Sequence, residues 1–312
     1  MGLSKTGTTF LQNHVFSPFD QIADFGKTPS YRAERPHVYE ALKIVASTPD
    51  AEFKARLPGL KTLLVREATD VVARKPNCSC RLLSYEGFFN PHSIPPIEIY
   101  DRLVSIFGEF KIFLTIRQQF AWIASYYLYK FYRFKQGGGP SFEVWAKRVR
   151  KHAAWNAFVC CNYWRVIEQL IHRAGRNAVL VEPMEGLIEA QCEDAVARLA
   201  RFLEVDGDAL ALQFSQGTPT KQRIDELGFL FGRVLYESRK ADLSGNQVLQ
   251  LKRLFRKIHT QLRHQYNKAN VPYDVIERYF SAAERTAIRD GNAVLSRHFG
   301  HDLGRFGYPL LT

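Results

Sequence analysis

The residues at the start of the chain have the types and the spacing of an anion-binding loop. Gly2, four further residues and Gly7 are followed by Thr8 and Thr9, which is the frame of a phosphate-binding loop. The lysine that usually follows the second glycine is replaced by Thr8, and a lysine lies upstream instead, at Lys5. Glycines allow successive backbone N–H groups to point inward around an anion, and Lys5 adds a full positive charge. The segment therefore predicts a site for phosphate or a similar oxyanion.

A second candidate anion site follows the apolar run 111–116. Arg117 comes directly after this run, and Ser125 lies eight residues later, about two helical turns on. Arginine suits a phosphate because its planar guanidinium can donate two hydrogen bonds to the phosphate oxygens. An arginine and a serine at this spacing are weak evidence alone and gain weight because they follow the loop.

These residues need a scaffold of alternating strands and helices. Short apolar runs predict buried strands at 21–25, 81–85, 111–116 and 177–181, and helical periodicity marks 60–74, 97–107 and 155–174. Strands that alternate with helices favour an α/β fold with a mostly parallel sheet flanked by helices. From residue 188 onward the pattern is almost entirely helical, including a basic stretch at 247–266. We therefore expect one domain over 1–312 with a helical C-terminal half. The glycine-rich turn 137–140 is either a plain linker or a lid over a bound acceptor.

The bulk composition agrees with a soluble protein that binds anions. Lysine and arginine (43) exceed aspartate and glutamate (31), giving a formal charge of +12 that favours an anionic partner. No apolar run reaches the roughly 18 residues of a membrane span, so we expect no transmembrane segment. The five cysteines lack the spacing of a zinc site and fit reduced thiols, which predicts a cytoplasmic location.

The loop segment Lys-Thr-Gly-Thr-Thr-Phe-Leu-Gln, residues 5–12, resembles the 5′-phosphosulfate loop of sulfotransferases that use 3′-phosphoadenosine 5′-phosphosulfate (PAPS). That family also has an arginine and a serine eight residues apart that bind the 3′-phosphate, and its strand-and-turn motif is similar to residues 179–187. The resemblance implies that Lys5 contacts the bridging oxygen of the leaving group. It further implies these donor-binding residues: Lys5, Thr6, Gly7, Thr8, Thr9, Phe10, Arg117 and Ser125.

The resemblance implies a P-loop NTPase-like three-layer fold and transfer of a sulfuryl group from PAPS to a hydroxyl, with 3′-phosphoadenosine 5′-phosphate (PAP) as product. We expect a carbohydrate acceptor, as in many bacterial-looking relatives. In that family a buried strand precedes the loop, and only Met1 precedes Gly2 here, so the first strand is expected to be missing. No metal site is apparent, and catalysis without a metal is expected because the basic loop can neutralise the developing charge.

An acceptor hydroxyl benefits from a base aimed at its proton. Glu86 is the candidate, because it follows the run 81–85 and in P-loop folds the strand beside the phosphate loop often ends in a carboxylate. Weaker candidates follow the run 21–25, at Glu34, His37 and Glu40.

Three alternatives remain open. A nucleotide kinase would want lysine at position 8 and would have no use for Arg117 with Ser125. An inactive, truncated relative could still bind anionic ligands. A nucleic-acid-binding protein would use the tyrosines and cations of 126–133 and the basic stretch 252–264, which we interpret instead as a solvated face, so no nucleic-acid partner is expected.

Overall fold

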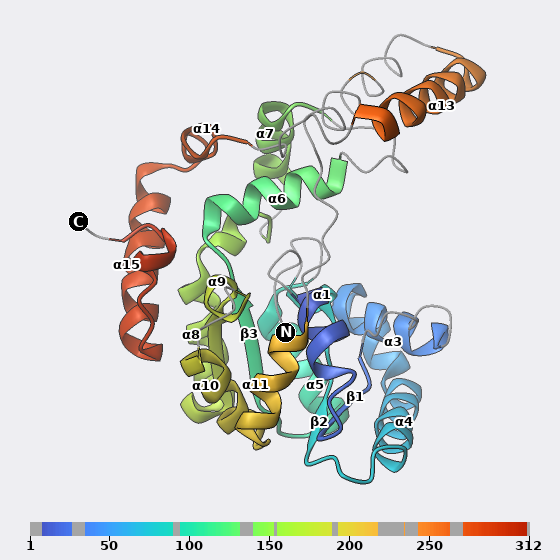
Figure 1. Ribbon diagram of the computed structural model, residues 1–312, viewed down its shortest axis with the longest axis vertical. Coiled ribbons are helices and arrows are strands. Elements are labelled where there is room, and N and C mark those ends of the chain that lie inside the picture. The colour runs from blue at the N-terminus through green and yellow to red at the C-terminus, as the bar shows by residue number, and fades with distance from the viewer. Residues whose placement is uncertain are drawn as a thin grey trace. The chain divides into compact units, whose positions relative to one another are not determined.

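The computed structural model (Figure 1) describes residues 8–26, 35–89, 94–131, 140–152, 155–188, 193–217, 234, 243–262 and 271–310. Contacts divide the chain into two compact units. The first comprises Met1–Gln118, Val159–Thr220 and Thr286–Thr312, and the second comprises Gln119–Phe158 and Lys221–Arg285. A single domain over 1–312 stays a prediction.

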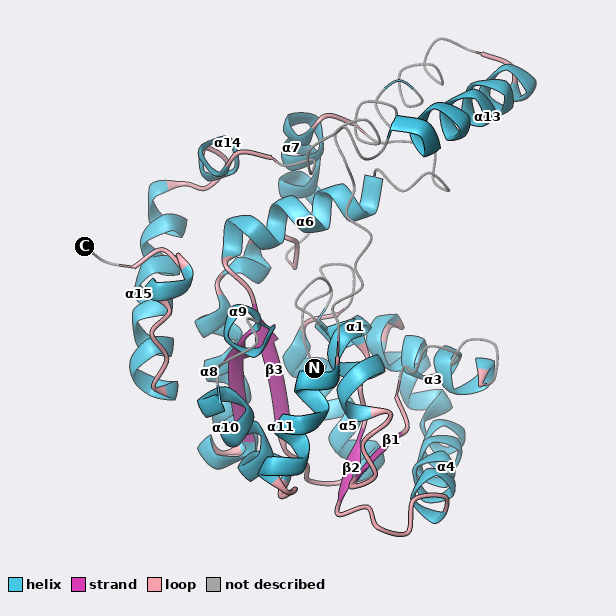
Figure 2. Cartoon of the chain, viewed as in Figure 1, coloured by secondary structure: helices cyan, strands magenta, loops and turns pink. Residues whose placement is uncertain are grey.

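Two parallel pairs of strands lie in the first unit (Figure 2). β1 (Ile22–Asp24) pairs with β2 (Cys80–Leu82), and β3 (Ile112–Ile116) pairs with β4 (Val179–Pro183). Each of the four apolar runs overlaps one strand, and all five residues of β3 are buried, as expected for a parallel strand covered on both faces. The α/β class is confirmed. Within the described ranges no strand joins the two pairs, so the three-layer fold stays a prediction.

Helices surround these strands in the first unit. The predicted helix 97–107 is α5, which has Pro96 in its first turn and ends at Gly108, a left-handed glycine with φ +78°. The predicted helix 60–74 is the second half of a longer helix, α4. The described helices of this unit are α1 (Thr8–Phe10), which continues into a π-helical segment (Leu11–Phe16), α3 (Pro36–Ser47), α4 (Asp50–Ala73), α5 (Pro96–Phe107), α8 (Tyr163–Ala174), α9 (Met184–Ile188), α10 (Glu193–Leu203), α11 (Gly207–Gln216) and most of α15 (Ala282–Phe299), from Thr286 on.

The helix predicted at 155–174 is shorter in the structure, and the prediction placed its start too early. α8 begins only at Tyr163, after a short 3₁₀ turn (Val159–Cys161). The cause is Asn162, whose side-chain oxygen accepts a hydrogen bond from the backbone N–H of Arg165 (3.3 Å) and so caps the helix. The apolar spacing upstream of the cap therefore belongs to turns that are buried.

The first unit has two main hydrophobic clusters. One joins the N-terminal helical segment to α10 and α11 through Phe10, Phe16 and Leu199. The other joins α3, α4 and α5. The first cluster also contains Ile22 of β1 and Phe113 of β3, so it packs the N-terminal helical segment against the strands.

The second unit has an aromatic core. Its helices within the described ranges are α6 (Gln119–Phe131), α7 (Phe142–His152), α13 (Gly245–Leu262), α14 (Tyr273–Glu277) and the first turn of α15 (Ala282–Phe299). Tyr127 is fully buried, its ring packs edge-on against Phe142, and its hydroxyl donates to the Pro140 carbonyl (2.7 Å). Tyr126 is also buried and stacks on Trp122. These rings fill a core and are not presented for base stacking.

The described residues after Ile188 are helices and turns, as predicted. The predicted basic helix is α13, on which Arg253 and Lys257 are exposed. None of the helices in the described ranges has the length and apolar character of a membrane span. Cys78, Cys80 and Cys160 carry free thiols, and the cytoplasmic location stays a prediction. The glycines at 137–139 lie outside the described residues.

Candidate functional site

A pocket opens beside the N-terminal helical segment in the first unit. The segment after β2 forms one wall, β3 forms another, and the helical segment covers them. The Gln12 side-chain amide donates to the Ser84 hydroxyl (2.6 Å) and so ties the helical segment to the end of β2. The walls are mainly apolar, with polar side chains from Thr8, Gln12, Ser84 and Thr115. The lining residues are Thr8, Leu11, Gln12, Phe16, Leu82, Leu83, Ser84, Tyr85, Phe113 and Thr115.

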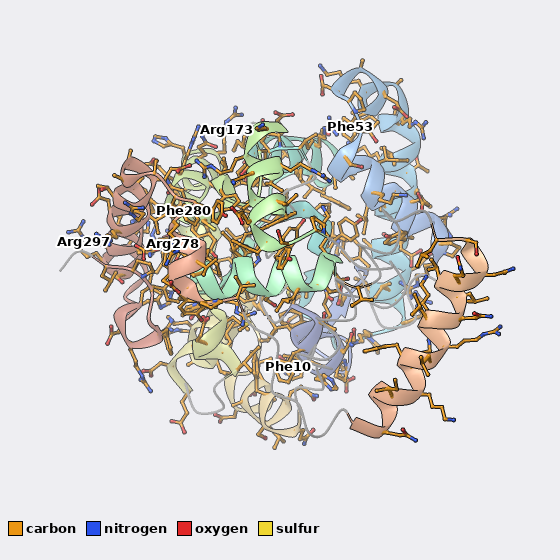
Figure 3. All side chains as sticks on the ribbon, turned by 90° about the horizontal axis from the view of Figure 1, so that it is seen from above. Phe10, Phe53, Arg173, Arg278, Phe280 and Arg297 are labelled. Carbon is orange, nitrogen blue, oxygen red and sulfur yellow. The ribbon has the colours of Figure 1, made fainter. Side chains whose placement is uncertain are left out.

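The predicted phosphate loop borders this pocket where it can be described. Lys5, Thr6 and Gly7 lie outside the described residues. Thr8 is buried and lines the pocket, whereas Thr9 is exposed. Phe10 (labelled in Figure 3) packs in the hydrophobic core, with its ring 6.1 Å from that of Phe214. Its side chain is therefore a packing group, and anion binding at this position would use the backbone.

Arg117 follows the last residue of β3. The peptide group that joins it to Gln118 is hydrogen-bonded at both its carbonyl oxygen and its N–H. The Tyr163 hydroxyl donates to the Arg117 carbonyl (2.6 Å), and the next backbone N–H, of Gln118, donates to Oε1 of Glu185 (3.2 Å). The other oxygen of Glu185 accepts from the Tyr308 hydroxyl (3.0 Å). Burial raises the pKa of Glu185, and these hydrogen bonds and the charge of Arg117 oppose that rise.

Sequence reasoning missed Tyr163, Glu185 and Tyr308. Ser125, the predicted partner of Arg117, lies half-buried on α6 in the second unit. The shared role of Arg117 and Ser125 stays a prediction.

Glu86 begins the 3₁₀ turn Glu86–Phe89, directly after Tyr85 of the pocket wall. Its side chain lies outside the described residues, as does the whole of Glu34. His37 lies 3.8 Å from Glu67, and Glu40 is exposed in an ion pair with Lys43 (3.0 Å). The role of Glu86 as base stays a prediction.

Asp24 is a buried carboxylate that the sequence did not single out. It ends β1, and its Oδ1 accepts a hydrogen bond from the Gly26 N–H (2.8 Å). Its Oδ2 is buried with no hydrogen-bond partner within the described ranges. Burial raises the pKa of Asp24 to about 7, against the lowering effects of the Gly26 hydrogen bond and the charge of Lys75. A Cβ at Gly26 would lie 2.2 Å from the Ser84 carbonyl oxygen, so only glycine fits beside the segment that forms the pocket wall.

A second buried carboxylate has a structural role. Glu182 on β4 is fully buried, and both of its oxygens accept from the Arg198 guanidinium, at 2.7 and 3.0 Å. His301 lies beside it and contacts the Val181 carbonyl (2.6 Å). Because its charge is fully paired, Glu182 secures α10 against β4, in keeping with the strand-and-turn role expected for 179–187.

No group of three or more histidine, cysteine, aspartate or glutamate side chains with metal-binding geometry occurs among the residues whose placement is described. Comparison of the chain with family models, with curated proteins and with solved structures gives no match.

Proposed function

We propose that the protein is a sulfotransferase that moves a sulfuryl group from PAPS to an acceptor hydroxyl. The observation that carries the proposal is the loop sequence Lys-Thr-Gly-Thr-Thr-Phe-Leu-Gln at 5–12. The position of Thr8, the first described residue of that segment, supports the proposal. Thr8 lines a pocket together with Ser84, which follows β2, and Thr115 on β3, and Arg117 follows β3 directly. Ligands of parallel α/β proteins bind at the carboxyl ends of the strands.

The predicted three-layer fold belongs to the same proposal. β2 and β3 both border the pocket, and each is paired in parallel with one further strand, β1 and β4 respectively. The proposed fold places both pairs in a single parallel sheet.

The proposed reaction is an in-line displacement. The acceptor hydroxyl oxygen forms a bond to sulfur while the bond from sulfur to the bridging oxygen of PAPS breaks, and the electron pair leaves with PAP. Lys5 is the group proposed to neutralise the charge that develops on that bridging oxygen. The hydroxyl proton passes to a base, for which Glu86 is the proposed group. Positioning and charge stabilisation supply the catalysis, as in phosphoryl transfer.

The acceptor is proposed to be a carbohydrate hydroxyl. The net charge of +12 favours an acidic glycan over a neutral lipid, because an acidic acceptor is attracted from a distance.

Calorimetric titration with PAP, AMP and ATP tests the donor site. The wild-type chain should bind PAP more tightly than AMP, and the preference should weaken in Arg117→Ala and disappear in Lys5→Ala. The matched control is Arg173→Ala, which removes an exposed guanidinium paired with Asp101 on the surface. Tighter binding of ATP than of PAP would favour the kinase alternative and overturn the proposal.

A further inference from the structure

The peptide bond that joins Arg117 to Gln118 is held at both of its polar atoms. Its carbonyl oxygen accepts from the Tyr163 hydroxyl, and its N–H donates to Glu185. A peptide group is planar, so two hydrogen bonds on opposite edges fix the rotation of that plane about the chain. That rotation includes the ψ angle of Arg117 and therefore controls where the arginine side chain leaves the backbone.

Glu185 is itself held by a residue from the C-terminal segment. Tyr308, which is 3% exposed, donates to the carboxylate oxygen that Gln118 does not use. The chain reaches this position through Gly307, whose φ of +72° is left-handed, and the Tyr308 N–H bonds back to the Leu303 carbonyl (3.2 Å). A left-handed turn at glycine thus brings Tyr308 against α9.

Burial raises the pKa of Glu185, and the charge of Arg117 opposes that rise. A half-buried carboxylate of this kind costs free energy unless its oxygens are satisfied. The Gln118 N–H satisfies Oε1 and the Tyr308 hydroxyl satisfies Oε2, so the carboxylate is held at both oxygens. Without the Tyr308 hydroxyl the carboxylate would be free to rotate, and its hold on the Gln118 N–H would loosen.

We propose that Glu185 and Tyr308 are positioning residues that aim Arg117 at the 3′-phosphate of the nucleotide. The inference rests on the proposed function, because it takes Arg117 as the 3′-phosphate ligand. Tyr163 and Glu185 fix the backbone of Arg117, and Tyr308 holds the Glu185 carboxylate in place. Bidentate binding of a phosphate depends on the orientation of the guanidinium plane, so small displacements reduce affinity.

The test compares the affinities for PAP and AMP, which differ only in the 3′-phosphate. Tyr308→Phe removes one hydroxyl without a change of charge, and Glu185→Asp keeps the charge but shortens the arm. Each should lower the ratio of PAP affinity to AMP affinity by about tenfold, the equivalent of one lost charge-assisted hydrogen bond. AMP affinity should stay at the wild-type value.

Tyr100→Phe is the matched control, because Tyr100 is a buried tyrosine of α5 whose ring packs against Phe110. It should leave the ratio unchanged. A purely structural role for Glu185 and Tyr308 would lower the unfolding temperature and leave the ratio at its wild-type value, which would overturn the inference.

The two failures are distinguishable. If the wild-type chain shows no preference for PAP, the proposed function fails and the inference fails with it. If the wild type prefers PAP and Tyr308→Phe keeps the same ratio of PAP affinity to AMP affinity, only the inference fails. Binding of AMP shows that each variant is folded. If Glu185→Asp does not fold, the affinity ratio of Tyr308→Phe alone tests the inference.

Discussion

Replacement of Asp24 by asparagine should remove a strong pH dependence from the stability of the fold. Burial raises the pKa of Asp24 from 3.8 to about 7. In the unfolded chain this carboxyl ionises near pH 4, whereas in the folded chain it keeps its proton up to about pH 7. The folded state therefore binds more protons between these values, and the free energy of unfolding falls as the pH rises from about 4 to about 7.

The shift corresponds to about 4 kcal/mol in total, of which about 2.5 kcal/mol falls between pH 5 and pH 8. Asparagine keeps an oxygen that can accept from the Gly26 N–H, and it does not ionise. The stability of Asp24→Asn relative to the wild type should therefore increase by about 2.5 kcal/mol over that pH range. Groups that titrate in both proteins cancel in this difference.

Urea denaturation at pH 5, 6, 7 and 8 measures the effect, with Asp70→Asn on the exposed side of α4 as control. The control should keep a constant difference from the wild type at every pH. A constant difference for Asp24→Asn as well would refute the reasoning, because it would mean that the folded carboxyl ionises at its ordinary pH.

Two further substitutions test the packing around the site. Lys75→Met should destabilise the fold by about 3 kcal/mol in urea denaturation, since the Lys75 ammonium donates to three backbone carbonyls of the segment 17–22 and the substitution removes all three of these hydrogen bonds. A change below about 0.5 kcal/mol, the level of an ordinary surface substitution, would contradict this. Arg198→Lys should lower the unfolding temperature measurably, because lysine cannot donate to both oxygens of the buried Glu182, and an unchanged unfolding temperature would show that this pair contributes nothing.

The strands were predictable because they are short and apolar. The run 111–116 could be recognised from its composition alone, since a parallel strand covered on both faces needs no polar alternation. The start of α8 was predicted wrongly because periodicity was followed through Asn162, although asparagine before an apolar helical pattern is itself a start signal.

The candidate site was predictable only where its residues follow one another in the sequence. The segment 5–12 and the pair Arg117 and Ser125 could be found by spacing. The groups that hold Arg117 could not, because Tyr163 is 46 residues away from it and Tyr308 is 123 residues away from Glu185. Such contacts depend on how α8, α9 and the C-terminal segment pack together.

Asp24 was missed for a different reason. It is the last residue of a strand that was identified from its apolar neighbours, and the burial of its carboxylate depends on tertiary packing. The close approach of Gly26 to Ser84 is what places this carboxylate beside the segment after β2. A carboxylate at the end of an apolar run was the signal available in the sequence.

Transfer of radiolabelled sulfate tests the central proposal most directly. The purified chain is incubated with PAPS labelled with ³⁵S and a panel of acidic and neutral glycans, phenols and lipids, and both labelled product and released PAP are measured. The proposal predicts label in at least one glycan with an equal amount of PAP, and loss of both in Lys5→Ala but not in Arg173→Ala. Label that stays in PAPS with every glycan, phenol and lipid acceptor offered would contradict it.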